Sequence, residues 1–246
     1  DTLSIRTKAE KTKDSYIING QKVWTSRAEY SDLMLLLART SSDKSLKRTE
    51  GLSLFIIDMQ KAKNNGLIIK PIKTMINHAT TEIFFDDLEI PLDNLIGKEG
   101  QGFKYILDRL NPERILIAAE ALGIGKNALA RAIKYAGDRV VFGKPIGQNQ
   151  SIQHPLAENW IELEAAELLI TKAAYQYDNG QNSGGMANAA KFFAAEAGFK
   201  AATQAIITLG GMGYAKEYHV ERLMRESLIP KLAPVSAQMI LNYISE

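Results

Sequence analysis

The sequence predicts an α+β protein in which an antiparallel β-domain is followed by a C-terminal four-helix bundle. Residues 1–96 contain short runs of β-forming residues separated by polar or glycine-bearing turns. From Gly100 onward the apolar residues instead recur with helical spacing, in long segments. Strands that all precede the helices are typical of α+β proteins or of two separate domains. We therefore assign residues 1–96 to a β-domain and residues 97–246 to a helical bundle domain.

The predicted strands of the first half cover residues 16–26, 33–38, 52–59, 66–72 and 81–90. Within the first of these segments, the Asn19-Gly20 pair is flanked by β-forming residues. This dipeptide is the strongest short signal for a two-residue hairpin turn, so we expect a hairpin there. The polar stretch 41–51 is expected to form a solvated loop.

The predicted helices of the second half cover residues 101–138, 149–178, 186–209, 215–228 and 234–245. Clusters of glycine, proline and polar residues separate them. The first helix is expected to kink around Asn111-Pro112, because proline interrupts helical hydrogen bonding. Residues 186–209 are rich in alanine, which suits helices that pack closely.

Composition excludes several classes of function. The 246 residues are 46% hydrophobic and 24% charged, with a net charge of +2, so no electrostatic argument favours nucleic acid or a membrane surface as a partner. The absence of cysteine excludes disulfides and thiolate nucleophiles. His78, His154 and His219 are scattered, so we expect no metal site. No apolar run reaches the roughly 18 residues that a membrane-spanning helix needs.

The opening segment has no methionine, apolar signal core or amphipathic leader, so the sequence looks as if it starts within a structure. We expect a cytoplasmic location if the source is bacterial and the mitochondrial matrix if it is eukaryotic.

Glu113 is the most unusual candidate residue. Asn111 suits the N-cap of a helix and Pro112 its first position, and the following run 115–119 is apolar on every side, which predicts a buried helix. An acid in the first turn is favoured by the helix dipole, by about 0.3–1 kcal/mol. If it is buried, desolvation instead raises its pKa toward that of a general base. The residue pattern leaves both interpretations open.

Two glycine-bearing segments resemble cofactor-binding motifs. Residues 123–128, GIGKNA, fit a dinucleotide-binding pattern, but no strand precedes them, so we favour close helix packing as the role of these glycines. Residues 210–214, GGMGY, follow a predicted helix. They suit either a helix C-cap or a loop whose N–H groups approach a phosphate or a flavin.

Two further segments carry aromatic residues beside polar ones. Arg139, Phe142 and Gln150 surround a predicted turn, either as ordinary surface residues or as partners for the pyrophosphate and adenine of a cofactor. Trp24-Thr25-Ser26 ends a predicted strand. It suits either a half-buried tryptophan on a sheet or a platform with hydroxyl groups for a polar ring system.

Three long segments together resemble the acyl-CoA dehydrogenase family. They are TTEIFFDDLEIPLDNLIGKEGQGF (80–103), VVFGKPIGQNQSIQ from Val140 and GGMGYAKEYHVERLMRE from Gly210. The resemblance implies FAD as cofactor and a β-domain followed by a four-helix bundle. The family also has an N-terminal helical domain and an opening of the β-domain that this sequence lacks, so the β-domain is expected to be incomplete and the chain as given to hold FAD poorly.

The resemblance implies roles for individual residues at the cofactor. Trp24, Thr25 and Ser26 match the segment that packs against the isoalloxazine. A second set matches positions that reach the adenosine diphosphate part of an FAD bound mainly by a neighbouring subunit: Arg139, Val141, Phe142 and Gln150. Gly210 and Gly211 match a glycine loop at the same cofactor, and Ser236 and Gln238 match a polar pair after the usual catalytic loop. The assembly implied is a homotetramer, a dimer of dimers.

The sequence departs from the commonest family pattern at the catalytic base. Many members carry a glutamate in a Tyr-Glu-Gly-Thr stretch, where this chain has Ala233-Pro234-Val235-Ser236. A minority, including the isovaleryl and long-chain types, carries the base in a Glu-Arg pair on the buried helix, which Glu113-Arg114 matches. The residues implied on the substrate side are Leu110, Asn111, Arg114 and Val235.

The activity implied is α,β-dehydrogenation of an acyl-CoA thioester to trans-2-enoyl-CoA. Glu113 removes the α-proton, a hydride leaves to flavin N5, and the electrons pass to an electron-transfer flavoprotein. Two alternatives stay open: an acyl-CoA oxidase on the same fold, or a non-catalytic paralogue or fragment that acts as a binding module.

Overall fold

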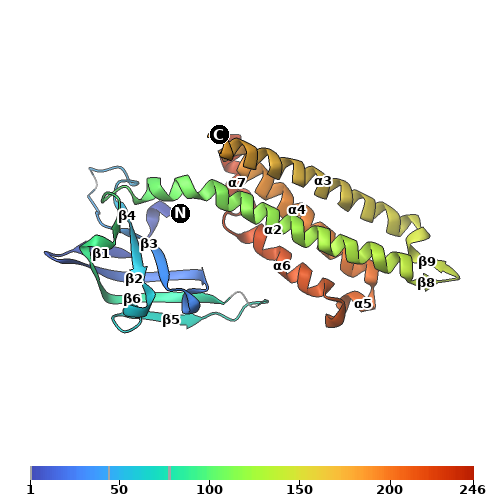
Figure 1. Cartoon of the computed structure of the whole chain (residues 1–246), viewed down its shortest axis with the longest axis horizontal. Helices are drawn as coiled ribbons and strands as arrows, with labels where there is room; N and C mark the ends of the chain where they lie inside the picture. Colours follow the sequence, from blue (N-terminus) through green and yellow to red (C-terminus); the bar gives the residue numbers. More distant parts are fainter. Residues whose placement is uncertain (1, 44, 77–78) are drawn as a thin grey trace. The chain divides into compact units, whose positions relative to one another are not determined.

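The computed structural model describes residues 2–43, 45–76 and 79–246 (Figure 1). The chain divides into two compact units, Asp1–Arg109 and Leu110–Glu246. The first holds a sheet and the second a set of packed helices, so the predicted α+β class with a C-terminal helical bundle is confirmed. His78 lies outside the described residues. Within the described part of the chain, no helix combines the length and apolarity needed to cross a membrane.

The described strands of the first unit form one seven-stranded sheet in the order β5-β6-β2-β1-β3-β4-β7. Their bounds are β1 (Lys8–Lys11), β2 (Ser15–Ser26), β3 (Leu33–Arg39), β4 (Leu52–Asp58), β5 (Leu67–Pro71), β6 (Thr80–Pro91) and β7 (Leu95–Ile96). Neighbours pair antiparallel except β1 and β3, which pair in parallel through Lys8 and Arg39. The prediction of a wholly antiparallel domain is therefore wrong at this pair.

Short helices connect these strands. The first unit contains α1 (Met59–Ala62) and the 3₁₀ turns η1 (Thr2–Ser4), η2 (Ala28–Tyr30) and η3 (Leu92–Asn94). The Asp58 carboxylate caps α1 by accepting from the N–H groups of Gln60 and Lys61, each at 3.1 Å. These hydrogen bonds lower the pKa of Asp58.

The hairpin predicted at Asn19-Gly20 is absent from the described chain, because β2 continues through both residues. The turn lies earlier, between β1 and β2, where the Thr12 N–H donates to the Ser15 carbonyl at 2.8 Å. Gly20 has φ +139°, and a Cβ there would lie 2.7 Å from the Thr7 Cα. Glycine is thus required for a close approach of two backbones, a need that the dipeptide pattern does not distinguish from a turn.

Two β-bulges interrupt the pairing of β2 with β6. Between Ile18 and Gly20 the extra residue is on β6, where Asp87 has φ +49°, and the Asn19 amide donates to the Asp87 carboxylate at 2.8 Å. Between Lys22 and Thr25 it is on β2, beside Trp24. An extra residue reverses which side chains face the core. After Thr80, the buried residues of β6 accordingly change from odd to even positions: Thr81, Ile83 and Phe85, then Leu88 and Ile90.

The core of the first unit is built around an aromatic pair. Tyr16 and Phe55 are buried and meet edge to face with ring centroids 4.9 Å apart. The Tyr16 hydroxyl donates to the Glu99 carboxylate at 2.9 Å. Burial, followed by this hydrogen bond and the Glu99 charge, raises the pKa of Tyr16 to about 12. The tyrosine therefore stays protonated and keeps its polar end satisfied.

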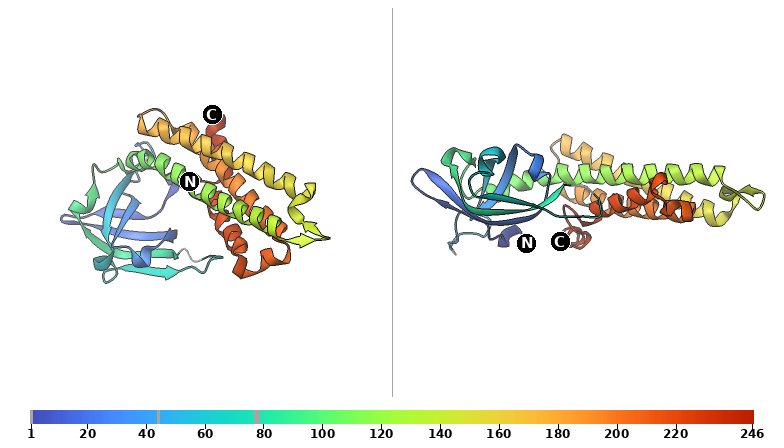
Figure 2. Two further views of the ribbon diagram at one scale, coloured as in Figure 1. Left: turned by 45° about the vertical axis from the view of Figure 1, so that its right-hand side comes forward. Right: turned by 90° about the horizontal axis from the view of Figure 1, so that it is seen from below.

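In the described residues, four long helices form the bundle, as predicted. They are α2 (Gly102–Asp138), α3 (Gln150–Asp178), α4 (Gly184–Leu209) and α6 (Val220–Leu232), and they run side by side in the views of Figure 2. Shorter elements join them: the hairpin of β8 (Val140–Val141) and β9 (Lys144–Pro145), η4 (Ile146–Gln148), α5 (Gly211–Tyr214), η5 (Lys216–Tyr218) and α7 (Ala237–Ser245). The predicted helix 215–228 begins later, at Val220, because His219 adopts a left-handed conformation with φ +62°.

The predicted helix start at Asn111-Pro112 is wrong. Helix α2 begins at Gly102 and includes Pro112 without ending there. Instead of capping a helix, the Asn111 side chain accepts a hydrogen bond from the Arg114 guanidinium at 3.0 Å. Burial of the following run on every side is also wrong, since Leu116 is 69% exposed. Helical propensity on both sides of Pro112 outweighs the single backbone hydrogen bond that a proline removes.

The interpretation of residues 123–128 as a packing motif is confirmed. Gly125 lies inside α2, where a Cβ would meet the Leu163 side chain at 2.7 Å and the Gly198 Cα at 2.8 Å. Alanine covers the buried face of α4, as its composition predicted. Gly125 therefore serves close helix contact, whereas a Cβ at Gly123 would meet no atom within 4 Å.

Candidate functional site

The first group of candidate residues follows the end of α2. Phe142 and Gly143 join β8 to β9 with φ values of +52° and +78°. Two successive residues with positive φ define the type I′ turn of a tight hairpin. This turn leaves the Phe142 side chain 98% exposed, and Arg139, Val141 and Gln150 are exposed as well. An open aromatic face thus stands beside an exposed guanidinium and an exposed amide.

Gly210 and Gly211 lie at the same end of the bundle (Figure 1). Gly210 has φ +59°, and its N–H donates to the Ile206 carbonyl at 3.0 Å, so the C-cap interpretation is confirmed. A Cβ at either glycine would meet no atom within 4 Å. The backbone here is open to a ligand, which leaves the cofactor interpretation as a prediction. The Tyr135 and Tyr218 rings, 6.1 Å apart, join α2 to η5 at this end.

The second group lies at the opposite end of the bundle. The part of α2 that belongs to the helical unit opens with Leu110, Asn111, Glu113 and Arg114. Val235 and Ser236 lie at the connection from α6 to α7, and Gln238 lies in the first turn of α7. The Ser236 hydroxyl caps α7 by accepting from the Met239 N–H at 3.4 Å. Arg114 and Val235 both approach Lys191 of α4: the Arg114 charge acts on the lysine, whose ammonium donates to the Val235 carbonyl at 2.6 Å.

Glu113 is exposed, so the interpretation of a buried acid with a raised pKa, which the sequence left open, does not hold. It lies well inside α2 rather than in a first turn, so the helix-dipole interpretation fails as well. Arg114 beside it is half-buried, and its Nε is buried with no hydrogen-bond partner among the described residues. Burial lowers the pKa of Arg114, while the charges of Tyr243 and Glu113 oppose that shift.

Lys191 is the residue of this region that the sequence interpretation missed. It is 1% exposed, and burial, followed by the Arg114 charge, lowers its pKa to about 8, against the opposing charge of Glu196. Its spacing gave a signal: Ala187 and Ala194, one turn away on each side, belong to the buried face of α4. A lysine on that face must be buried.

Trp24, Thr25 and Ser26 form the end of β2, in the first unit. Trp24 occupies the bulge with φ +63° and is 68% exposed, so it is not the half-buried residue of a regular strand. The Thr25 carbonyl accepts from the Thr81 hydroxyl at 2.8 Å, which fixes the backbone after the bulge. The indole and the Ser26 hydroxyl are both open to a ligand.

The two groups of the helical unit are far apart. Glu113 and Asp138, the last residue of α2, are separated by 25 residues, or about 37 Å at 1.5 Å per residue. That length exceeds one extended FAD molecule. Within one bundle, Arg139 and Phe142 therefore lie beyond the far end of α2 from Glu113.

Comparison with protein families identifies the family to which both units belong. The acyl-CoA dehydrogenase middle domain matches residues 1–88, and the acyl-CoA dehydrogenase C-terminal domain matches residues 100–241. Both units therefore carry domains of one flavoprotein family. The chain belongs to the acyl-CoA dehydrogenase family, whose members depend on FAD.

Individual relatives agree with this assignment. The chain is 37% identical over 246 residues to an acyl-CoA dehydrogenase of Mycobacterium bovis, covering 98% of this chain and 62% of the relative. It is 38% identical over 239 residues to the cyclohex-1-ene-1-carbonyl-CoA dehydrogenase of Syntrophus aciditrophicus, covering 94% and 56%. Butyryl-CoA dehydrogenase from Megasphaera elsdenii superposes with a TM-score of 0.92 at 34% identity, covering 100% and 64%. The chain thus spans less than two thirds of the length of each of these three relatives.

Proposed function

We propose that the protein containing this chain oxidises an acyl-CoA thioester to trans-2-enoyl-CoA, with Glu113 as the base that removes the α-proton. The assignment of Glu113 as the base rests on which of two segments offers a carboxylate. The connection 233–236 offers no carboxylate, whereas Glu113 is an exposed carboxylate at the same end of the bundle. The homology of the chain supports the reaction class, since its relatives include dehydrogenases of acyl-CoA substrates.

Other acids are less suited to this role. Glu120 lies seven residues further along α2, about 10 Å away. Glu226 on α6 accepts a hydrogen bond from Arg222 at 2.7 Å, so its carboxylate is already engaged. Glu113 has no such partner among the hydrogen bonds of the described residues and is free to accept a proton.

The exposed residues fit FAD by their chemistry. Phe142 offers a stacking face for adenine, Arg139 offers a bidentate donor for pyrophosphate, and the open backbone at Gly210 and Gly211 permits close approach. Val141 and Gln150 adjoin this surface. Trp24, Thr25 and Ser26 are assigned to the isoalloxazine, and Ser236 and Gln238 to the same cofactor. Bound FAD supplies the acceptor for the β-hydrogen, which leaves as hydride.

We assign the substrate side to Leu110, Asn111, Arg114 and Val235. Asn111 orients the Arg114 guanidinium through a hydrogen bond at 3.0 Å, and the Glu113 charge acts on that guanidinium. Removal of the α-proton places negative charge on the thioester carbonyl oxygen. A backbone N–H near Val235 would stabilise that charge if it is held in place before the reaction.

We also propose that the functional assembly is a homotetramer, a dimer of dimers. The length of α2 supports this. In this assignment Arg139 and Ser236 of one bundle lie too far apart to contact one FAD molecule, so Arg139 contacts the FAD of another copy. A second copy supplies the missing contact. The proposed electron acceptor is an electron-transfer flavoprotein. One similar solved structure, at 34% identity and a TM-score of 0.91, is described as an electron transferring flavoprotein of Acidaminococcus fermentans.

The test of the function is an anaerobic titration of the purified yellow protein with a panel of acyl-CoA thioesters. Loss of the oxidised flavin absorbance with one or more of them supports the proposal. An oxidase is the second candidate, because the chain is also similar to a prolyl acyl carrier protein oxidase, at 30% identity and a TM-score of 0.91. Rapid reoxidation in air with release of peroxide would indicate that activity. A flavin that no thioester reduces would contradict both.

A further inference from the structure

A buried lysine holds the connection between α6 and α7. The Lys191 ammonium, on α4, donates to the Val235 carbonyl at 2.6 Å. A hydrogen bond from a charged donor is shorter and stronger than a neutral one. The next residue, Ser236, is fixed as the N-cap of α7. Two consecutive residues of the connection 233–236 are therefore held in place.

Lys191 is poorly suited to stabilising the bundle. The opposing charge that acts on it, Glu196, is paired with Lys231 at 2.8 Å, and the Arg114 guanidinium on α2 repels it. Its charge is consequently disfavoured where it lies. A methionine would fill similar space without a buried charge, and replacing buried ions by apolar residues is often neutral or stabilising. A residue that lowers stability in this way is typical of a functional site.

The hydrogen bond from Lys191 to the Val235 carbonyl also fixes the direction of a backbone N–H group. A trans peptide unit is planar, so its carbonyl and the N–H of the next residue point in opposite directions. Because the Val235 carbonyl points to Lys191, the Ser236 N–H points away from it. Pro234 has no N–H, and the Ala233 N–H donates to the Ile229 carbonyl at 2.9 Å, which leaves the N–H groups of Val235 and Ser236. Of these two, only the Ser236 N–H belongs to the peptide unit whose carbonyl Lys191 holds. In the described chain no hydrogen bond from the Ser236 N–H occurs.

We propose that Lys191 is a positioning residue of the acyl-CoA site, which holds the Val235 carbonyl so that the Ser236 N–H is presented to the carbonyl oxygen of the thioester. This inference rests on the proposed function. It identifies which backbone donor stabilises the negative charge that develops when Glu113 takes the α-proton. Lys191 itself does not touch the substrate in this assignment and acts through the peptide unit.

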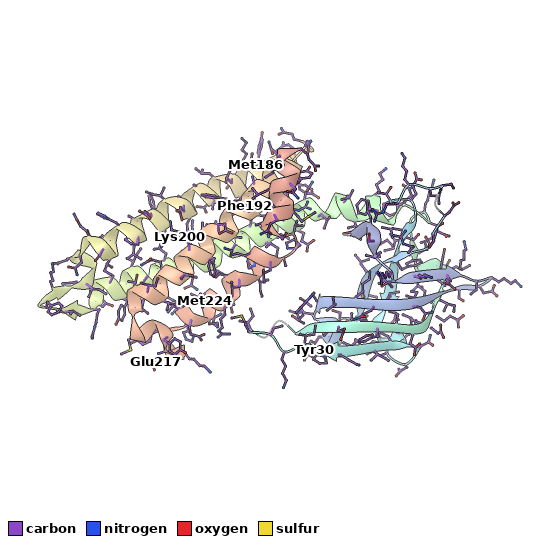
Figure 3. The ribbon with its side chains drawn as sticks, turned by 180° about the vertical axis from the view of Figure 1, so that it is seen from behind. Tyr30, Met186, Phe192, Lys200, Glu217 and Met224 are labelled. Carbon is purple, nitrogen blue, oxygen red and sulfur yellow. The ribbon has the colours of Figure 1, made fainter. Side chains whose placement is uncertain are left out.

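The test compares Lys191→Met with Lys200→Met. Lys200, labelled on α4 in Figure 3, is an exposed lysine that pairs with Glu162 at 2.7 Å, so its loss controls for removal of a lysine from the same helix. Hydrogen–deuterium exchange of a peptide covering residues 232–240 reports the connection directly. We expect about tenfold faster exchange in Lys191→Met, because a charge-assisted hydrogen bond shifts an opening equilibrium by at least that factor. Exchange in Lys200→Met should match the wild type.

Stopped-flow reduction of the flavin by acyl-CoA gives the second measurement. We expect the reduction rate constant at saturating substrate to fall tenfold or more in Lys191→Met, with a smaller change in the dissociation constant, and Lys191→Arg to recover part of the rate. Unchanged exchange and an unchanged rate in Lys191→Met would overturn the inference. If Lys191→Met does not fold, Lys191→Gln carries the same comparison. A wild type that no acyl-CoA reduces refutes the proposed function, whereas the exchange measurement still decides whether Lys191 holds the connection.

Discussion

The Cα of Gly198 lies 2.8 Å from the position that a Cβ on Gly125 would occupy. Helices α2 and α4 therefore touch through their backbones at this point, and no side chain separates them. The contact predicts that Gly125→Ala lowers the free energy of unfolding by about 1–3 kcal/mol, as overpacking does in other cores. Denaturant unfolding measures this change.

The same helix offers a matched control. A Cβ at Gly123 would meet no atom within 4 Å, so Gly123→Ala adds a methyl group without a clash. We expect it to raise the free energy of unfolding by about 0.5–1 kcal/mol, because alanine is the better helix former. Equal effects of the two substitutions would contradict the contact.

Glu113→Gln tests the assignment of the base. The amide keeps the size of the side chain but cannot accept the α-proton, so acyl-CoA should still bind while flavin reduction slows by about 10²–10⁴-fold. Stopped-flow absorbance separates the two steps. Glu120→Gln, on the same helix, should reduce at the wild-type rate. Equal losses in Glu226→Gln with binding intact would refute the assignment to Glu113.

Phe142→Ala tests the proposed cofactor surface. We expect FAD to dissociate about fivefold more readily, since an aromatic stacking contact contributes on the order of 1 kcal/mol. The stability of the bundle should not change, because the side chain makes little contact with the chain itself. Val140→Ala removes another exposed apolar group from the same hairpin and should leave FAD affinity unaltered. Fluorescence titration of the apoprotein gives both values.

The pKa of Lys191 predicts a pH dependence of stability. The value of about 8 in the folded protein lies below the ordinary 10.5, so between these pH values the unfolded chain binds a proton that the folded chain releases. The cost of the buried charge is therefore complete below pH about 8 and disappears as the pH rises toward 10.5. Lys191→Met should gain stability relative to the wild type at pH 7 and lose that advantage by pH 10.

Lys200 is the control for this titration, with the opposite sign. The hydrogen bond to Glu162 raises its pKa, so its pair with that acid stabilises the fold below the ordinary pKa of lysine and is lost at higher pH. Lys200→Met should show no gain at pH 7. Denaturant unfolding of both variants at pH 7 and pH 10 makes the comparison, and a pH-independent difference for Lys191→Met would contradict the assigned pKa.

The proposed assembly predicts that flavin-loaded protein is a tetramer by light scattering. The reason is the distance along α2 between the two groups of cofactor residues. Flavin-loaded monomers in solution would contradict the proposal.

Periodicity predicted the elements of the bundle well because each long helix repeats one signal many times. Helix α3 begins and ends within a residue of its prediction. Single-residue signals were less reliable. Asn19-Gly20 suggests a chain reversal, and Asn111-Pro112 suggests a helix start. The role of Gly20 depends instead on the backbone of Thr7, and that of Asn111-Pro112 on helix α2, which continues on both sides. Neither constraint can be read from the dipeptide alone. Lys191 was missed for a related reason: its importance depends on a carbonyl 44 residues away.

The two bulges between β2 and β6 cancel one another, because one adds a residue to β6 and the other adds a residue to β2. From the pair Ser15–Pro91 to the pair Ser26–Thr80, both strands advance by eleven residues, so the extra residue beside Asp87 is cancelled by the one beside Trp24. Only the segment between them is out of phase. Deleting a single residue at Trp24 would shift the pairing of everything after it, whereas removing one residue at each bulge would restore the phase. The position of the exposed Trp24 indole thus depends on both bulges, one on each strand.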